Sequence, residues 1–126
     1  FLKKNRIKNI KLPVSAPFHC SLMSKATDIM REELGKLSFK KGKNSLISNI
    51  TANEIFNANE LKDLLVKQIE NRVRWRESVI NMIEKGVNQF IEIGPGKVLS
   101  GLVKRINKDV EVISINNEDD IKSIKI

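Results

Sequence analysis

The chain has 126 residues, which is enough for one ordinary domain with a hydrophobic core and too few for two. Its residues are 40% hydrophobic and 30% charged, a globular composition that argues against an intrinsically disordered chain. The formal net charge is +8, and five of the positive residues lie among the first eleven positions, where there is no acidic residue.

The basic excess has two interpretations. Such charge can attract nucleic acid, an anionic membrane or an acidic protein. However, Lys, Ile and Asn together make up 47 of the 126 residues, a bias that AT-rich codons produce without any binding role, and we favour this compositional interpretation. The basic cluster around Gly42 also lacks the interleaved aromatic residues on which nucleic-acid bases stack. A basic nucleic-acid module is therefore kept only as a minor hypothesis, and no nucleic-acid partner is expected.

Several other classes are excluded. No apolar run approaches the roughly 18 residues that span a bilayer, and the basic N-terminal end lacks the apolar centre of a secretory signal, so we expect no membrane association. Cys20 and His19 are the only cysteine and histidine, which leaves no intrachain disulfide and no metal site. A reducing, cytoplasmic setting fits best. Because the chain begins at Phe1 in what reads as mid-domain sequence, we expect a fragment or a trimmed chain.

In the first half of the chain the predicted elements begin with a short strand over 10–14, which Pro13 limits to a sheet edge or a strand end. A helix follows from Ser21 and ends with Gly35 as its C-cap. Residues 45–50 read as a second strand between turn residues. In the helix that starts at Ser21, the inward face is expected to hold Leu22, Ala26, Ile29, Met30 and Leu34.

Two helices are expected next. Asn57 and Glu60 resemble a capping box that opens the first of them, with Leu61, Leu64, Leu65 and Ile69 facing inward. The second places Trp75, Val79, Met82 and Ile83 on one face and ends at Gly86.

The rest of the chain alternates between strand and helix. An apolar strand over 90–93 runs into Gly94, a helix covers 98–106, a strand covers 110–115, and acidic residues open a last short helix, where the helix dipole favours them. This alternation predicts an α/β fold with a parallel sheet covered by helices on both faces.

Few residues offer chemistry on their own. His19 lies at the junction of a strand and a helix, where open α/β sheets place their sites, although a lone histidine is more often structural than catalytic. Cys20 invites a Cys-His dyad, but neighbouring side chains of an extended chain point apart, so a small buried hydrophobe is the better interpretation. Gly94-Pro95-Gly96-Lys97 matches neither phosphate-loop pattern and reads as a tight turn, whose N–H groups could still meet an anion.

Four motifs occur in order along the chain. They are LPVSAPFHCSLM at 12–23, SNIT at 48–51, LVKQ at 65–68 with VRW at 73–75, and FIEIGPGKVL at 90–99. Together, in this order and at this spacing, they closely resemble the malonyl-CoA:acyl carrier protein transacylase family. The resemblance covers less than half of such an enzyme, its C-terminal part.

The resemblance implies a fold and a domain division. Residues 1–14 would be the end of a ferredoxin-like small subdomain, and residues 15–126 the C-terminal part of the α/β-hydrolase-like large subdomain of the acyltransferase, with a parallel sheet flanked by helices. Family members often have proline where this chain has Arg72, which leaves the start of the following helix open.

The resemblance also implies an activity. Family members attack malonyl-CoA with the serine of a Gly-His-Ser-x-Gly elbow and pass the malonyl group to the phosphopantetheine thiol of acyl carrier protein in fatty-acid biosynthesis, with no cofactor beyond these substrates. No such elbow occurs in this chain, so the nucleophile would lie outside it. His19 matches the catalytic histidine, and Gln68 the residue whose main-chain carbonyl orients it. Asn49 matches a site-adjacent asparagine, and Phe18 resembles malonyl-selective relatives.

A different class of function remains open. The chain could be a non-catalytic fragment or a split-gene remnant that is inactive alone because the serine is missing. Such a piece would leave an apolar face exposed where the absent half belongs.

Overall fold

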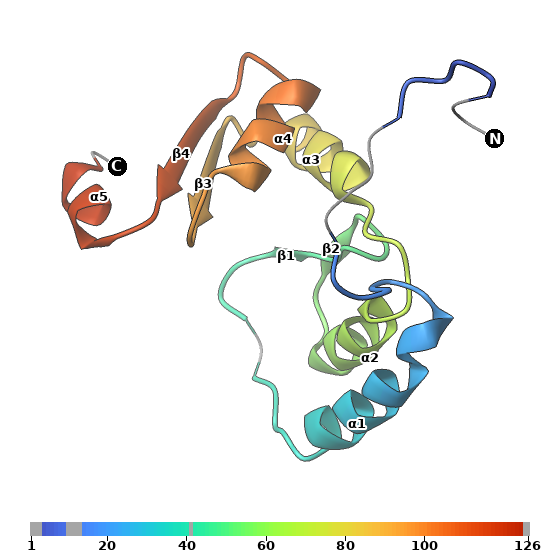
Figure 1. The fold of residues 1–126 in the computed structure, drawn as a ribbon. Coiled ribbons are helices and arrows are strands. Elements are labelled where there is room, and N and C mark those ends of the chain that lie inside the picture. Colours follow the sequence, from blue (N-terminus) through green and yellow to red (C-terminus); the bar gives the residue numbers. More distant parts are fainter. Residues whose placement is uncertain (1–3, 10–13, 41, 125–126) are drawn as a thin grey trace.

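The computed structural model describes residues 4–9, 14–40 and 42–124 (Figure 1). The chain forms a lower part, in which two helices lie side by side beneath a small hairpin, and an upper part built on a second small sheet. Most of the strand expected over 10–14 lies outside the described residues, and Val14 is not in a strand.

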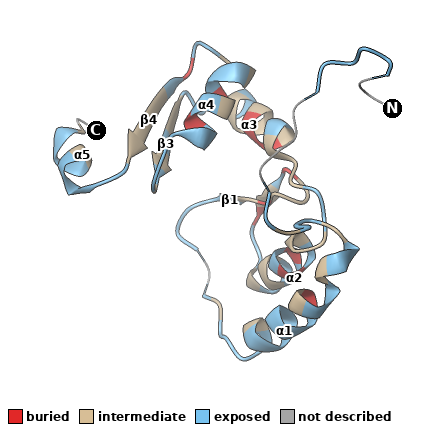
Figure 2. Cartoon of the chain, in the orientation of Figure 1, coloured by how far each residue is buried: buried red, intermediate tan, exposed pale blue. Residues whose placement is uncertain are grey.

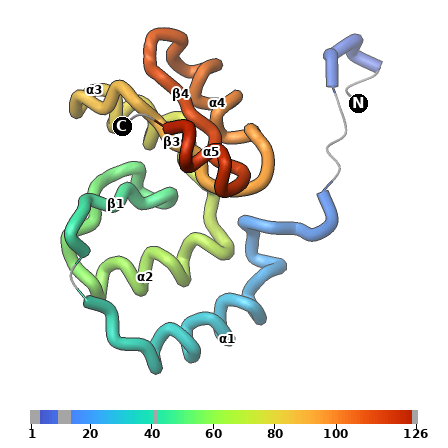
Figure 3. Tube along the Cα trace, turned by 90° about the vertical axis from the view of Figure 1, so that its left-hand side faces the viewer, coloured from blue at the N-terminus to red at the C-terminus, as the bar shows by residue number. Residues whose placement is uncertain are grey.

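The first helix begins with a 3-10 turn, η1 (Ser21–Met23), and continues as α1 (Ser24–Gly35). It packs against α2 (Ala58–Gln68), as the views in Figures 1 and 3 agree. The expected C-cap at Gly35 is wrong. Gly35 is the last helical residue, and Lys36 caps the helix in a right-handed conformation, so no left-handed residue is needed at this end.

The apolar face of α1 is largely uncovered (Figure 2). Leu22 and Ile29, expected inward, are 76% and 65% exposed, Met30 is exposed as well, and Thr27 is the buried residue of the helix. The periodicity predicted a helix here, but it did not identify the buried position, and it carries no information about whether another layer covers the apolar side chains.

Helix α2 begins where the sequence predicts. The Asn57 side-chain oxygen accepts hydrogen bonds from the N–H groups of Asn59 and Glu60, at 2.8 and 3.4 Å, which satisfies two donors that a helix start leaves unpaired. Leu64 is buried, as expected, while Leu65 is exposed and Val66 is buried instead. The buried face is therefore turned relative to the one predicted.

The lower sheet is an antiparallel pair of two-residue strands, β1 (Leu46–Ile47) and β2 (Glu54–Ile55). The sequence predicted a longer strand over 45–50 and no β2, and it predicted only parallel pairing. The chain turns early because the Ser48 hydroxyl oxygen accepts the N–H groups of Ile50 and Thr51, a local bond that competes with strand pairing.

The upper part matches the predicted elements closely. It contains α3 (Trp75–Glu84), β3 (Gln89–Ile93), α4 (Val98–Ile106), β4 (Glu111–Ile115) and α5 (Glu118–Ser123). Strands β3 and β4 pair in parallel, from Gln89 opposite Glu111 to Ile93 opposite Ile115. Val79, Val103 and Val110 form a buried cluster against which Phe90 and Val112 of the sheet pack. The α/β class and the parallel pairing in this part are confirmed.

Helices cover one face of this upper sheet within the described residues. Phe90 and Val112 face the cluster formed with α3 and α4, whereas Ile91 is exposed and Ile93 is 79% exposed on the alternate positions. Coverage of both faces, as the sequence predicted, is therefore wrong for this chain. None of the helices in the described ranges is long and apolar enough to cross a bilayer.

Candidate active site

His19 lies in the loop that leads into η1, and its backbone adopts an unusual conformation. Its φ angle is +60°, in the left-handed region that non-glycine residues seldom occupy. The His19 N–H donates to the carbonyl of Ile69 at 3.2 Å, which ties this loop to the segment just after α2. A strained conformation held by a contact distant in sequence is a feature of functional sites.

The imidazole of His19 is fixed by the end of the same helix. Its Nδ1 lies 2.9 Å from the main-chain carbonyl oxygen of Gln68, the last residue of α2. Because a carbonyl oxygen can only accept, Nδ1 must carry the proton in this contact, and Nε2 of the neutral ring is left as an acceptor. The side chain is exposed, so this free nitrogen is accessible.

A cavity of about 240 Å³ opens beside this histidine. Its walls are formed by residues of the His19 loop, η1 and the second half of α2: Phe18, His19, Met23, Leu65, Gln68 and Ile69. His19 and Gln68 are the polar members of this set, and the others are apolar. The site therefore offers a hydrogen-bonded imidazole at the edge of an apolar hollow, an arrangement suited to moving a proton at a partly desolvated group.

Asn49 is placed on the neighbouring turn between β1 and β2. Its main-chain carbonyl accepts the N–H of Arg74 at 2.8 Å, and the Arg74 guanidinium reaches the Thr51 carbonyl at 3.3 Å. Within the described residues no hydrogen bond joins Asn49 directly to His19. The connection runs instead through the segment between α2 and α3, which binds His19 at one end and Asn49 at the other.

Cys20 does not form a dyad with His19. Its sulfur lies 3.1 Å from the carbonyl of Pro17, and the residue is half-buried rather than fully buried as predicted. The left-handed conformation of His19 means that the extended-chain argument does not describe this pair, but the outcome for the dyad is the same.

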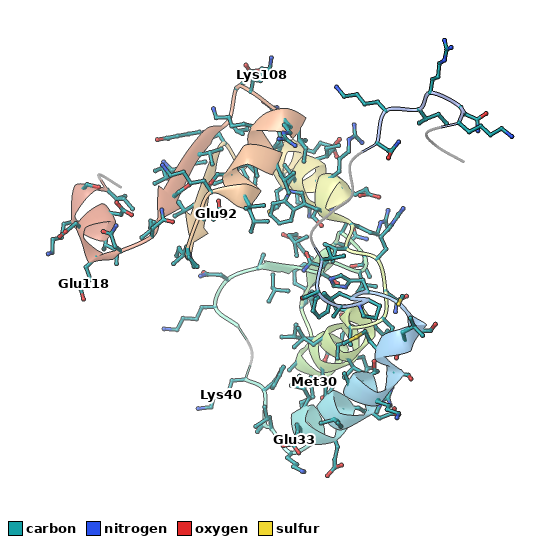
Figure 4. All side chains as sticks on the ribbon, in the orientation of Figure 1. Met30, Glu33, Lys40, Glu92, Lys108 and Glu118 are labelled. Carbon is teal, nitrogen blue, oxygen red and sulfur yellow. The ribbon has the colours of Figure 1, made fainter. Side chains whose placement is uncertain are left out.

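The loop over Gly94-Pro95-Gly96-Lys97 is a tight turn whose two glycines have φ angles of +139° and +96°. Glu92, labelled in Figure 4, occupies the start of α4 with its carboxylate, which accepts the N–H groups of Leu99 and Ser100 at 3.1 and 2.8 Å. Hydrogen bonding to Ser100, through its hydroxyl and then its N–H, is the main cause that lowers the pKa of Glu92, and the Leu99 N–H adds to it. An anion at this helix start, which the sequence left open, would have to displace a carboxylate already there.

Sequence reasoning missed the residues that hold this site together. The Ile69 carbonyl and the Arg74 N–H contribute through main-chain atoms, in contacts specific to the fold. Hydrophobic periodicity carries no signal for such contacts.

Comparison with known proteins identifies relatives of this chain. The malonyl CoA-acyl carrier protein transacylase of Bacillus subtilis is 40% identical over 121 residues, 95% of this chain. The crystal structure of malonyl CoA-acyl carrier protein transacylase from Clostridium perfringens matches 96% of this chain, with a TM-score of 0.86 and 40% sequence identity. No family model matches. The chain is related to the malonyl-CoA:acyl carrier protein transacylases.

This relation confirms the resemblance seen in the four motifs. A further related structure, with a TM-score of 0.82 and 36% identity over 89% of this chain, is that of a malonyl-transacylase in complex with its type II PKS acyl carrier protein. The chain spans 38% of the length of both the Bacillus subtilis protein and the Clostridium perfringens chain. The similarity is therefore to a part of each of these relatives.

Proposed function

We propose that this chain belongs to a malonyl-CoA:acyl carrier protein transacylase and supplies its catalytic histidine, His19. The observation that carries the proposal is the contact of His19 Nδ1 with the Gln68 carbonyl, because in the neutral ring it makes Nε2 the acceptor beside an apolar cavity. The names of the relatives support the substrates, malonyl-CoA and acyl carrier protein. The nucleophile is a serine of a Gly-His-Ser-x-Gly elbow in a segment outside this chain.

In the first half-reaction, Nε2 of His19 takes the proton of the serine hydroxyl while the serine oxygen bonds to the thioester carbonyl carbon of malonyl-CoA. The carbon–sulfur bond breaks, the imidazolium returns the proton to the leaving CoA thiolate, and a malonyl-serine ester remains. In the second half, Nε2 takes the proton of the carrier-protein thiol, whose sulfur attacks the ester, and the proton returns to the serine oxygen. No cofactor is consumed in either half.

Gln68 orients the base through its main chain. Its carbonyl does what an aspartate does in a Ser-His-Asp triad, since it fixes the tautomer in which Nε2 faces the nucleophile. The carbonyl belongs to the C-terminal turn of α2, where a helix carries partial negative charge that interacts favourably with a cationic ring. Asn49 is a site-adjacent residue whose carbonyl accepts the N–H of Arg74, and Phe18 lines the cavity beside His19.

The domain division belongs to the same proposal. Residues 1–14 would end a ferredoxin-like small subdomain, and residues 15–126 would form the C-terminal part of the hydrolase-like large subdomain. The uncovered apolar side chains of the upper part, with Ile93 79% and Val98 72% exposed, support a larger domain around this chain.

A basic surface near the ends of α3 and α4 supports the carrier protein as partner. Arg72, Arg76 and Arg105 surround a cavity of about 410 Å³. All three are exposed, and for Arg76 and Arg105 no ion pair occurs within the portion of the chain that the structure describes. Acyl carrier proteins are acidic, so these charges would speed encounter, an effect that weakens with salt over a Debye length of about 8 Å.

The alternative is that this chain acts as a non-catalytic piece. The exposed apolar side chains favour it for the 126 residues in isolation, because a separated part of a larger domain leaves such surface open. For the isolated chain we expect no malonyl loading of carrier protein, since the serine is absent.

Malonyl transfer to acyl carrier protein by the full-length protein tests the proposal. His19→Ala should lower kcat about 10²- to 10⁴-fold, the usual contribution of a positioned base. Gln68→Ala is the matched control, because it keeps the main-chain carbonyl, and it should lower kcat much less than His19→Ala does. Wild-type transfer by the His19→Ala protein would refute the role of His19, and malonyl loading by the isolated 126 residues would refute a nucleophile outside them.

A further inference from the structure

The last turn of α2 has an unusual distribution of hydrogen bonds. A helix leaves its final carbonyls without partners in the helix, so other groups must bind them. Local N–H groups take the first two: Ile69 donates to Val66 at 3.3 Å, and Glu70 and Asn71 donate to Lys67 at 3.3 and 3.2 Å. The next two carbonyls, of Gln68 and Ile69, both accept from His19, which is 49 residues away from Gln68.

Asn71 closes this turn with its side chain as well as its backbone. Its Nδ2 donates to the Lys67 carbonyl at 2.7 Å, so one residue bonds the same carbonyl twice. In a helix that continued, the Gln68 carbonyl would accept the N–H of Arg72, four residues on. The backbone N–H of Asn71 makes the last regular i+4 bond, to Lys67, and its side chain binds the same carbonyl, while the Gln68 carbonyl is bound by the imidazole.

We propose that Asn71 is a positioning residue for His19: by binding the Lys67 carbonyl it ends α2 so that the Gln68 carbonyl receives Nδ1–H. Asn71 is exposed and lies outside the set of residues that line the cavity, so it acts through the helix end and not on a substrate. Its importance for transfer rests on the proposed role of His19. Its effect on which ring nitrogen carries the proton does not depend on that proposed role.

The hypothesis that Asn71 is only a structural cap leads to a different expected result. If Asn71 only stabilised α2, its removal would lower the stability of the protein and leave the imidazole bonded as before. If it positions His19, its removal lets the chain after Gln68 relax toward the local i+4 bond, and Nδ1 loses its partner. The two roles therefore differ in which ring nitrogen carries the proton.

Imidazole ¹⁵N NMR of the full-length protein at a pH where the ring is neutral measures this directly. The His19 signals are those lost in His19→Gln. The wild-type ring should be mainly protonated on Nδ1. In Asn71→Ala the ratio of Nε2–H to Nδ1–H should rise about fivefold, the size expected when one hydrogen bond loses its support. Asn88→Ala, a change at an exposed asparagine before β3, is the matched control and should leave the ratio unchanged.

Two further variants make the test decisive. Asn71→Gln keeps a carboxamide donor and should restore part of the wild-type ratio. Asn71→Asp has nearly the same size but no donor, and it should shift the ratio at least as far as Asn71→Ala, so it decides the question if the alanine variant does not fold. An unchanged ratio in a folded variant without the donor overturns the inference. A shifted ratio with wild-type transfer supports the positioning role and instead contradicts the proposed function of His19.

Discussion

The upper and lower parts of the molecule differ in how their buried residues are arranged. In the upper part, from α3 to α5, a cluster of buried valines joins two helices to a parallel strand pair. In the lower part, from the His19 loop to the end of α2, polar Thr27 and Ser48 are buried beside apolar residues such as Leu64 and Val66, and side-chain bonds to the backbone shape the turns. Figure 2 shows buried segments in both. The candidate site thus belongs to the part whose shape depends on directional contacts.

This division suits the chemistry. Apolar burial is not directional, so it supplies stability without specifying where a single atom points. Orienting an imidazole requires groups with a defined direction, and main-chain carbonyls at a helix end provide them. A mutation should therefore have its largest effect on stability in the upper part and on geometry in the lower part.

Val79→Ala should have the largest effect on stability. The residue is fully buried at 0% exposure, and losing two methyl groups from this cluster should lower the free energy of unfolding by about 1–3 kcal/mol. Val98→Ala is the control, since Val98 is 72% exposed, and its cost in the 126-residue chain should stay within about 0.5 kcal/mol. Urea unfolding measures both. Equal costs for the two variants would show that burial in the upper part is not what the structure indicates.

Asn81→Ala tests the junction between the two parts. The Asn81 side chain, on α3, donates to the Ala52 carbonyl at 2.7 Å and to the Asn53 side-chain oxygen at 3.1 Å. Losing these bonds should cost about 1 kcal/mol, less than Val79→Ala, because water replaces part of them.

The Asn81 effect should be local. Amide hydrogen exchange in the turn around Asn49 should accelerate, while the Val79 cluster keeps its protection. Uniform acceleration across both parts would contradict the view that the junction is held by separate polar contacts.

The sequence predicted the upper part well for a physical reason. The elements from α3 to β4 carry a repeating apolar pattern, and Gly86 and Gly94 mark the ends of α3 and β3 with positive φ angles, so local pattern and tertiary structure agree. What the sequence could not predict there is coverage: the exposed face with Ile93 has the same apolar pattern as a buried one.

The lower part was predicted less well because its determinants are not periodic. The two-residue strand β2 exists because the Ser48 hydroxyl turns the chain, and nothing in the pattern around Glu54 marks a strand. His19 stood out only as the single histidine within a recognisable motif. The carbonyls of Gln68 and Ile69 that hold it are common to every amino acid, so residue identity contains no signal for them.

At the start of α4, directional hydrogen bonds to the Glu92 carboxylate cap a helix that also packs by apolar burial. The pH dependence of stability caused by these bonds should be the smallest of the predicted effects. Hydrogen bonds from Ser100 and Leu99 lower the pKa of Glu92 in the folded protein below its value in the unfolded chain. The unfolded state therefore binds more protons, so the stabilisation is complete above the unfolded pKa and is lost as the pH falls through the folded one. Unfolding measured across acidic pH should show Glu92→Gln less stable than wild type at neutral pH. The difference should vanish at low pH, where wild-type Glu92 is protonated. A difference that stayed constant with pH would mean that the glutamate acts through packing, not through the charge it holds at the helix start.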